Sequence, residues 1–295
     1  MAELSASCIT GSLVIAITNP LDCLKQRWQV APSGSHASLL HFARAVVASD
    51  GLVGGLWMPG IASNMIACTI SVGTRLGLYP LLRDGIPKRT GAGMFASGLL
   101  GGALGYIVGA PFFSATRIMQ AEVGSLTPDG TKYATGALTG SAPTVRGTNG
   151  VPMLLHLARS HGVLSLWRGS EVLVARGALM SATQLATYDA TKAWLRHVGL
   201  VDGPLVHCIA SLAASLTLTT AICPLDVTYT AFLAGPSLGR HYSSPLACAR
   251  ALVHEDGVRA MLRGWVPLWL RFLPSSVLTF LIYEQSRRIM LGEYL

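Results

Sequence analysis

The chain has 295 residues, of which 51% are hydrophobic and only 12% are charged, and its formal net charge is +8. A soluble domain carries about 25% charged residues, so this composition excludes an ordinary soluble protein and favours one that crosses a membrane several times. We expect neither an enzyme nor a nucleic-acid-binding protein, because no catalytic or phosphate-binding motif occurs and basic loops beside a membrane account for the charge. The six cysteines lack metal-site spacing, and we expect no metal and no cofactor.

Charge-free segments predict the membrane helices. Residues 94–116 and 203–225 each exceed the roughly 20 residues needed to cross a bilayer, and residues 4–21 and 51–74 are also free of charge. Hydrophobic patterning and turn residues predict six long helices and three short surface helices. The long helices are expected over 4–30, 60–83, 92–121, 170–197, 204–234 and 265–291, and the short ones over 39–50, 153–161 and 245–254.

One ten-residue pattern occurs three times, each time within a long apolar helix. It reads Pro-Leu-Asp-Cys-Leu-Lys-Gln-Arg-Trp-Gln from Pro20, and weaker copies begin at Pro111 and Pro224. Copies spaced about a third of the chain apart predict three repeats, each with a long helix, a loop, a short surface helix and a second long helix. We place the repeats at 1–90, 91–200 and 201–295. Six crossings would put both termini on the side of the short links between repeats.

These patterns resemble those of the mitochondrial carrier family over residues 4–291. Besides the proline motifs, the resemblance rests on Trp167-Arg168-Gly169 and on two five-residue motifs that begin at Tyr188 and Tyr283. It implies an all-α membrane protein whose six transmembrane helices form a threefold pseudo-symmetric barrel with a central cavity and short matrix helices. It also implies a place in the mitochondrial inner membrane, with both termini toward the intermembrane space. Within the family, the chain is most similar to carriers of oxaloacetate, oxoglutarate and other dicarboxylates.

In this family the proline motifs supply a gate on the matrix side, in which the acid of one repeat pairs with the base of the next. The resemblance therefore implies an ion pair between Lys25 and Asp226. The implied matrix gate comprises Asp22, Lys25, Gln29, Gln120 and Asp226, with the two glutamines bracing ion pairs. Solvated ion pairs are worth about 0–1 kcal/mol each, which suits a gate that must open.

The second copy of the motif lacks both charged residues, because Phe113 and Thr116 stand at the positions of the acid and the base. Asp22 would then face Thr116, and Phe113 would face Tyr229. Arg117 stands one place past the expected base, and we expect it to reach Asp22 through a bend in the helix.

The ends of the even-numbered long helices imply a second gate on the cytosolic side. It comprises Tyr79, Arg83, Tyr188, Asp189, Lys192, Tyr283, Glu284 and Arg287. Two ion pairs are implied, Arg83 with Asp189 and Lys192 with Glu284, and Arg287 would lack a partner. Two pairs here against one on the matrix side predict that the empty protein is closed toward the cytosol and open toward the matrix.

Three arginines inside apolar helices are the candidate substrate ligands, because an arginine within a membrane must face water, a partner or a substrate. Arg176 and Arg271 occupy one level, since each lies 12 residues before the tyrosine of its gate motif, whereas Arg75 lies nearer the cytosolic end. The family resemblance implies a substrate-binding set of Arg75, Arg176, Gly177, Arg271, Ala67 and Cys68. Converging guanidiniums suit a small dianion, because each holds carboxylate or sulfate oxygens through paired donors.

We therefore expect transport of a small dicarboxylate, oxoacid or sulfate by alternating access. Two alternatives stay open: an uncoupling-type leak of protons or fatty-acid anions, and a membrane scaffold of carrier descent that does not transport. We expect a monomer whose partners are the anionic substrate and anionic lipid such as cardiolipin. The lipid would meet the basic long-loop side, where segments 23–57, 117–168 and 227–263 carry +2, +3 and +2, although simple orientation in the membrane explains this charge equally well.

Overall fold

The computed structural model describes residues 2–31, 38–84, 91–129, 131–141, 150–200, 204–272 and 278. Within these residues the chain forms helices joined by turns, with isolated β-bridges in one loop, which is the predicted all-α fold. The long helices are α1 (Ala2–Val30), α3 (Ile61–Asp84), α4 (Gly91–Glu122), α6 (Ser170–His197) and α7 (Pro204–Ala234), and a further helical segment begins at 265 and is described to 272. The short helices are α2 (Leu39–Asp50), α5 (Gly150–His161) and α8 (Pro245–Asp256).

The short helices begin and end where the sequence supplies capping residues. The hydroxyl of Ser38 accepts a hydrogen bond from the backbone N–H of His41, and Ser244 does the same for Ala247. Gly51 ends α2 with a φ of 77°, a backbone conformation that glycine adopts at little cost. These local signals explain why the predicted bounds of the described helices differ from the observed ones by only a few residues, whereas the predicted end at 291 of the last helix lies outside the described residues.

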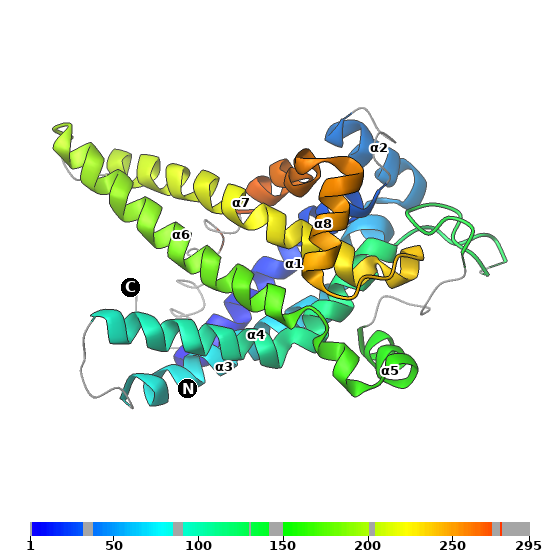
Figure 1. Cartoon of the computed structure of the whole chain (residues 1–295), viewed down its shortest axis with the longest axis horizontal. Coiled ribbons are helices and arrows are strands. Elements are labelled where there is room, and N and C mark those ends of the chain that lie inside the picture. The colour runs from blue at the N-terminus through cyan, green and yellow to red at the C-terminus, as the bar shows by residue number, and fades with distance from the viewer. Residues whose placement is uncertain are drawn as a thin grey trace.

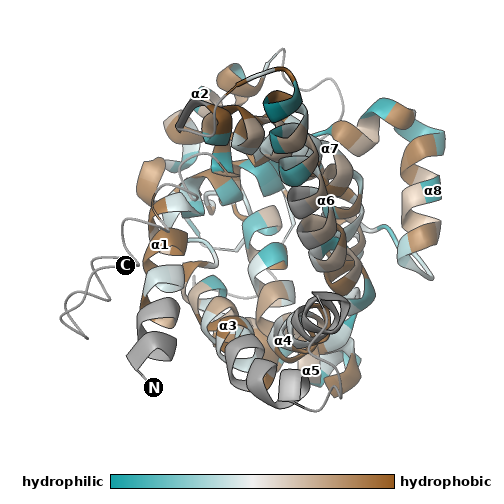
Figure 2. Ribbon diagram, turned by 90° about the vertical axis from the view of Figure 1, so that its left-hand side faces the viewer, coloured by the Kyte–Doolittle hydropathy of each residue, from teal (hydrophilic) through white to brown (hydrophobic). Residues whose placement is uncertain are grey.

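The long helices form a ring. α3 packs against α1 and α4, α6 packs against α4 and α7, and α7 contacts α1. Figure 2 shows these helices arranged around a common centre. The short helices and long loops gather at one end of the ring, here called the long-loop end, and Figure 1 shows α6 and α7 lying apart from α3 and α4 at the opposite, short-link end.

A proline lies inside each of the helices α1, α4 and α7, as predicted. Proline has no backbone N–H, so the carbonyl four residues before it loses its helical donor. In α1 and α4 an indole N–H takes that place. Trp57 donates to the carbonyl of Ala16 at 2.8 Å, four residues before Pro20, and Trp167 donates to the carbonyl of Ile107 at 2.9 Å, four residues before Pro111.

The third repeat shows a variant of the same contact. The Nε1 atom of Trp265 donates to the side-chain oxygen of Thr220, four residues before Pro224, at a distance of 3.0 Å. The tryptophans, which lie just before or at the start of a long helix, thus connect it to the proline-containing part of another. Their spacing near helix ends suggests interfacial aromatics from sequence alone, and this hydrogen-bonding role emerges only from the structure.

The outer surface of the ring is apolar. Large hydrophobic side chains such as Leu13, Leu100 and Leu212 are exposed on α1, α4 and α7. In the part of the chain that the structure describes, Val53–Thr74, Leu99–Glu122 and Val206–Ala234 are long and apolar enough to cross a membrane. A hydrophobic exterior around a centre that holds buried Lys25 and Asp226 is the reverse of a soluble domain and fits a lipid environment.

Candidate functional site

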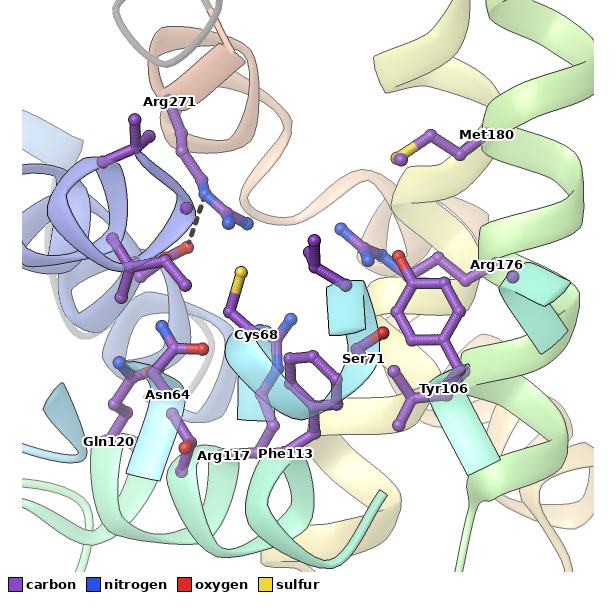
Figure 3. Close-up of a pocket in the computed structure, with 18 of the residues that line it drawn as sticks. Asn64, Cys68, Ser71, Tyr106, Phe113, Arg117, Gln120, Arg176, Met180 and Arg271 are labelled. Atoms are coloured by element: carbon purple, nitrogen blue, oxygen red, sulfur yellow. Dashed lines mark ion pairs between the residues drawn. The ribbon is translucent and has the colours of Figure 1, made fainter. Parts of the chain in front are cut away.

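A cavity of about 400 Å³ lies in the middle of the ring (Figure 3). Its walls come from α1, α3, α4, α6 and the segment at 265–272. Much of the lining comes from residues before the prolines along α1 and α4, such as Val14 and Tyr106, so the cavity extends toward the short-link end. The charged residues that line it, within the part of the chain that the structure describes, are Asp22, Arg117, Arg176 and Arg271.

Below the cavity, the predicted ion pair between Lys25 and Asp226 is present. Their Nζ and Oδ2 atoms lie 2.6 Å apart, and both side chains are fully buried. Gln29 donates to the same carboxylate oxygen at 3.3 Å and also to the backbone carbonyl of Arg263, which is the bracing position expected for this glutamine. The pair fastens α1 to α7 at the level where the proline motifs meet.

Two arginines share the other oxygen of Asp226. Arg176 Nε lies 3.1 Å from Oδ1, and Arg117 Nη2 lies 3.4 Å from it. The expectation that Arg117 reaches Asp22 is therefore wrong. A helix turns by about 100° per residue, so one place past Thr116 the side chain leaves α4 in a different direction, toward α7 and the ring of Tyr229.

Asp22 is paired with Arg271 instead of facing Thr116. The Nε atom of Arg271 lies 3.1 Å from Oδ1 of Asp22, and Figure 3 marks this ion pair with a dashed line. Thr116 turns its hydroxyl back to its own helix and donates to the carbonyl of Phe112 at 2.8 Å. This local bond satisfies a buried hydroxyl without a partner from another repeat.

The expected contact of Phe113 with Tyr229 is also replaced. The Tyr229 hydroxyl lies 3.2 Å from Oγ of Ser114, whereas the ring of Phe113 packs beside Tyr106, with centroids 5.8 Å apart. A buried phenol needs a hydrogen-bond partner, and Ser114 supplies one that phenylalanine lacks.

Gln120 braces a different group from the one expected. Its amide donates to Oδ1 of Asn19 at 3.0 Å, and Asn19 in turn donates to the carbonyls of Trp57 and Pro59. Asn19 is fully buried and was not among the predicted site residues. An amide directly before the proline of an apolar helix was the available signal, because a buried amide must be hydrogen-bonded.

Of the predicted substrate ligands, Arg176, Arg271 and Cys68 line the cavity. Ala67 does not: it is fully buried, and its carbonyl lies against Gly109 of α4. Gly177 lies beneath the ring of Tyr106, where an added Cβ would come within 2.4 Å of that ring. The glycine thus makes room for a cavity-lining aromatic that the sequence did not identify.

The predicted cytosolic gate lies at the short-link end and is described only in part. The Tyr188 hydroxyl lies 2.6 Å from Nδ1 of His207, so it joins α6 to α7, and Asp189 is exposed. Lys192 is half-buried. The side chains of Arg75, Tyr79, Arg83, Tyr283, Glu284 and Arg287 lie outside the described residues.

The structure is closed at the long-loop end, which contradicts the expectation of an empty protein open at that end. Lys25 and Asp226 are fully buried there, and Asp22 is 3% exposed. The count of ion pairs was wrong because it left out the cavity arginines. Arg271 neutralises Asp22, and Arg176 adds to the pairing of Asp226, so this end is held by more than one ionic contact.

A polar latch outside the membrane-spanning segments reinforces this closed end. Arg27 Nη2 lies 2.5 Å from Asp50 at the end of α2, and Asp50 also accepts hydrogen bonds from Ser125 and Thr135 in the loop after α4. Burial raises the pKa of Asp50, but the hydrogen bonds from Ser125, Thr135 and Arg27 outweigh it and hold the pKa below its usual value. The repeat pattern predicts a loop here, and its anchor at Asp50 emerges only from the structure.

Comparison with known proteins identifies the family. The family model described as "Mitochondrial carrier protein" matches residues 1–90, 87–199 and 201–294. The chain is 27% identical to a probable mitochondrial 2-oxoglutarate/malate carrier protein of Dictyostelium discoideum, over 94% of this chain and 86% of the relative. It is 30% identical to mitochondrial citrate transporter F of Aspergillus niger, over 97% and 87%, and 33% identical to mitochondrial uncoupling protein 6 of Arabidopsis thaliana, over 78% and 66%. The chain, with its three repeats and its closed polar centre, belongs to the mitochondrial carrier family, whose members are transporters.

Proposed function

We propose that this carrier moves small dianions, such as dicarboxylates, oxoacids or sulfate, across the mitochondrial inner membrane by alternating access. The charge balance of the cavity and its closed end supports this substrate class. Among the described residues there, four cations face two carboxylates. The cations are Lys25, Arg117, Arg176 and Arg271, and the carboxylates are Asp22 and Asp226. An anion with two negative charges would balance the excess.

The chemistry and size of the cavity support the same class. Guanidinium groups hold carboxylate and sulfate oxygens through paired donors, and Arg176 and Arg271 approach from different helices. The volume of about 400 Å³ lies at the lower end of the range for small-molecule sites, which suits a small anion with some water. Asp22 lines the cavity but is paired with Arg271, so a cationic amino acid would meet a carboxylate that already has a partner.

The remaining features of the proposal rest on the family resemblance and on the charge of the loops. The termini would face the intermembrane space and the long-loop end the matrix. The carrier would act as a monomer that catalyses no covalent chemistry. The basic segments of the long-loop end would contact anionic lipid such as cardiolipin. Passage to the matrix would require the contacts of Asp22 and Asp226 to separate, and substrate would offset that loss.

An uncoupling-type leak is the second candidate, because one relative that is 33% identical is named a mitochondrial uncoupling protein. The scaffold alternative is less well supported, since a protein that does not transport has no use for arginines that line a cavity.

Uptake into proteoliposomes tests the proposal. The panel would contain radiolabelled oxaloacetate, malate, oxoglutarate, citrate, sulfate and phosphate, with proton flux measured in parallel. We expect uptake of at least one dianion at a rate well above that of empty liposomes. Proton flux that purine nucleotides inhibit, without uptake of any anion, would favour the leak and overturn the proposal.

A further inference from the structure

Among the residues that the structure describes, Arg117 is the one cavity-lining arginine that neither the motif positions nor the expected substrate levels include. It follows Thr116, which occupies the usual place of the base, and its side chain extends from α4. The side chain is 11% exposed and lines the cavity together with Arg176 and Arg271. Figure 3 draws it rising from α4 beside Phe113 toward the middle of the cavity.

The guanidinium of Arg117 has donors that the closed structure does not use. Its Nη1 atom is buried and has no hydrogen-bond partner among the described residues. Its Nη2 atom lies 3.4 Å from Asp226, which is long for a charge-assisted hydrogen bond of about 2.7–2.9 Å. A buried cation with unused donors is expensive to maintain unless another group pairs with it at some stage.

Arg176 is in a similar situation on the same oxygen. Its Nε atom lies 3.1 Å from Asp226 Oδ1, but at an angle that does not form a hydrogen bond. Arg117 and Arg176 therefore hold one carboxylate oxygen from α4 and from α6, and neither holds it well. Asp226 meanwhile has a short contact with Lys25, at 2.6 Å, through its other oxygen, Oδ2.

The cavity thus has two carboxylate-binding positions. One is the pair formed by Arg117 and Arg176, and the other is Arg271, which holds Asp22 from another wall. Arg271 is the most exposed of the three arginines, with 23% of its side chain accessible, so a single carboxylate would reach it first.

We propose that Arg117 is a third substrate-binding guanidinium. One carboxylate of a dicarboxylate lies between Arg117 and Arg176, and the other lies at Arg271. This inference rests on the proposed transport of dianions and assigns it a specificity residue in α4. Binding would take Arg117 and Arg176 from Asp226, so that Asp226 loses its ionic contacts with α4 and α6 while keeping its contact with Lys25.

The test compares a dicarboxylate with its matched monocarboxylate. Malate uptake and its inhibition by 3-hydroxybutyrate, which lacks one carboxylate, would be measured in proteoliposomes with wild type, Arg117→Gln and Arg271→Gln. We expect Arg117→Gln to raise the KM for malate about tenfold or more while the inhibition constant of 3-hydroxybutyrate stays nearly unchanged. Arg271→Gln would raise both the KM for malate and the inhibition constant of 3-hydroxybutyrate. Arg240→Gln, which alters an exposed pair with Glu255, would change neither constant.

Arg117→Lys keeps the charge but lacks the planar guanidinium, so its KM for malate would lie between those of wild type and Arg117→Gln. If Arg117→Gln shows no cooperative thermal unfolding transition, Arg117→Lys takes its place in the comparison. A loss of equal size for both anions in these variants would assign Arg117 to the closed gate alone and overturn the inference, as would an unchanged KM for malate. Wild type that takes up no dianion would instead refute the proposed function.

Discussion

Arg176 lies 3.1 Å from Asp226, although the two residues belong to different repeats and were assigned to different sites. The structure joins the substrate level to the closed end in one charged cluster. A carboxylate that enters the cavity therefore competes directly with the acids that hold this end closed. This arrangement gives substrate a way to shift the balance between the two conformations, since a ligand acts only through its differential affinity for them.

The cluster predicts the effect of Asp226→Asn. The substitution leaves Lys25, Arg117 and Arg176 without their shared carboxylate, and breaking a buried pair costs about 3–5 kcal/mol. We expect the long-loop end to open more often, so that the fully buried thiol of Cys23 reacts faster with a maleimide.

Cys208 is exposed and would react at the same rate in both proteins. Asp129→Asn, at an exposed loop position, is the matched control and should leave Cys23 protected. A rate at Cys23 that is the same in wild type and Asp226→Asn would show that this carboxylate does not hold the end closed.

The indole contacts predict a stability effect for Trp167→Phe. Phenylalanine keeps the ring but leaves the Ile107 carbonyl without a donor, and Pro111 supplies none. A net hydrogen bond is worth about 0.5–1.5 kcal/mol, so we expect a lower thermal unfolding midpoint in detergent. Trp194→Phe, at a side chain that is 62% exposed, should shift the midpoint much less. Equal midpoints for the two variants would be inconsistent with a structural role of the indole N–H.

The latch at Asp50 predicts a pH dependence. Because the pKa of Asp50 is lower in the folded protein, its contribution to stability is present above the unfolded value of about 3.9 and is lost as the pH falls through the folded value. Asp50→Asn should therefore lower the unfolding midpoint near neutral pH, with a difference from wild type that shrinks in acid. A difference that stays constant from pH 7 to pH 3 would assign the effect to packing.

Gly177 predicts a change in the size preference of the cavity. An alanine there would press against the Tyr106 ring, since the added Cβ would lie 2.4 Å from it, and the ring would move into the cavity. We expect Gly177→Ala to raise the KM for oxoglutarate more than that for sulfate. Gly73→Ala, where an added Cβ meets nothing within 4 Å, should affect neither. An unaltered preference in Gly177→Ala would remove Tyr106 from the substrate path.

Much of the fold was predictable because its signals are local. Charge-free runs, proline motifs and turn residues such as Gly51 fix the helices without knowledge of distant contacts, and the family resemblance implied the pairing of Lys25 with Asp226. The directions of the side chains could not be predicted in this way. One residue of helical register sends Arg117 to Asp226 instead of Asp22, and the partner of Asp22 proved to be Arg271.

The missed residues share a physical feature. Asn19 and Trp57 satisfy, or donate to, backbone groups that proline or a helix end leaves free, and such needs appear only once two helices are placed together. The expectation that the long-loop end is open was wrong for a related reason. It followed from counting pairs within the motif positions, whereas arginines outside those positions contribute to the closed end.

The central claim is that positive groups in the shared cavity bind the transported anion. The most direct measurement is dianion uptake by proteoliposomes that contain wild type, Arg176→Ala, Arg271→Ala or Arg240→Ala, the last altering an exposed surface pair. We expect uptake by wild type and Arg240→Ala and its abolition in the two cavity variants, all at matched amounts of folded protein. Uptake that persists unchanged in Arg176→Ala and Arg271→Ala would contradict the account.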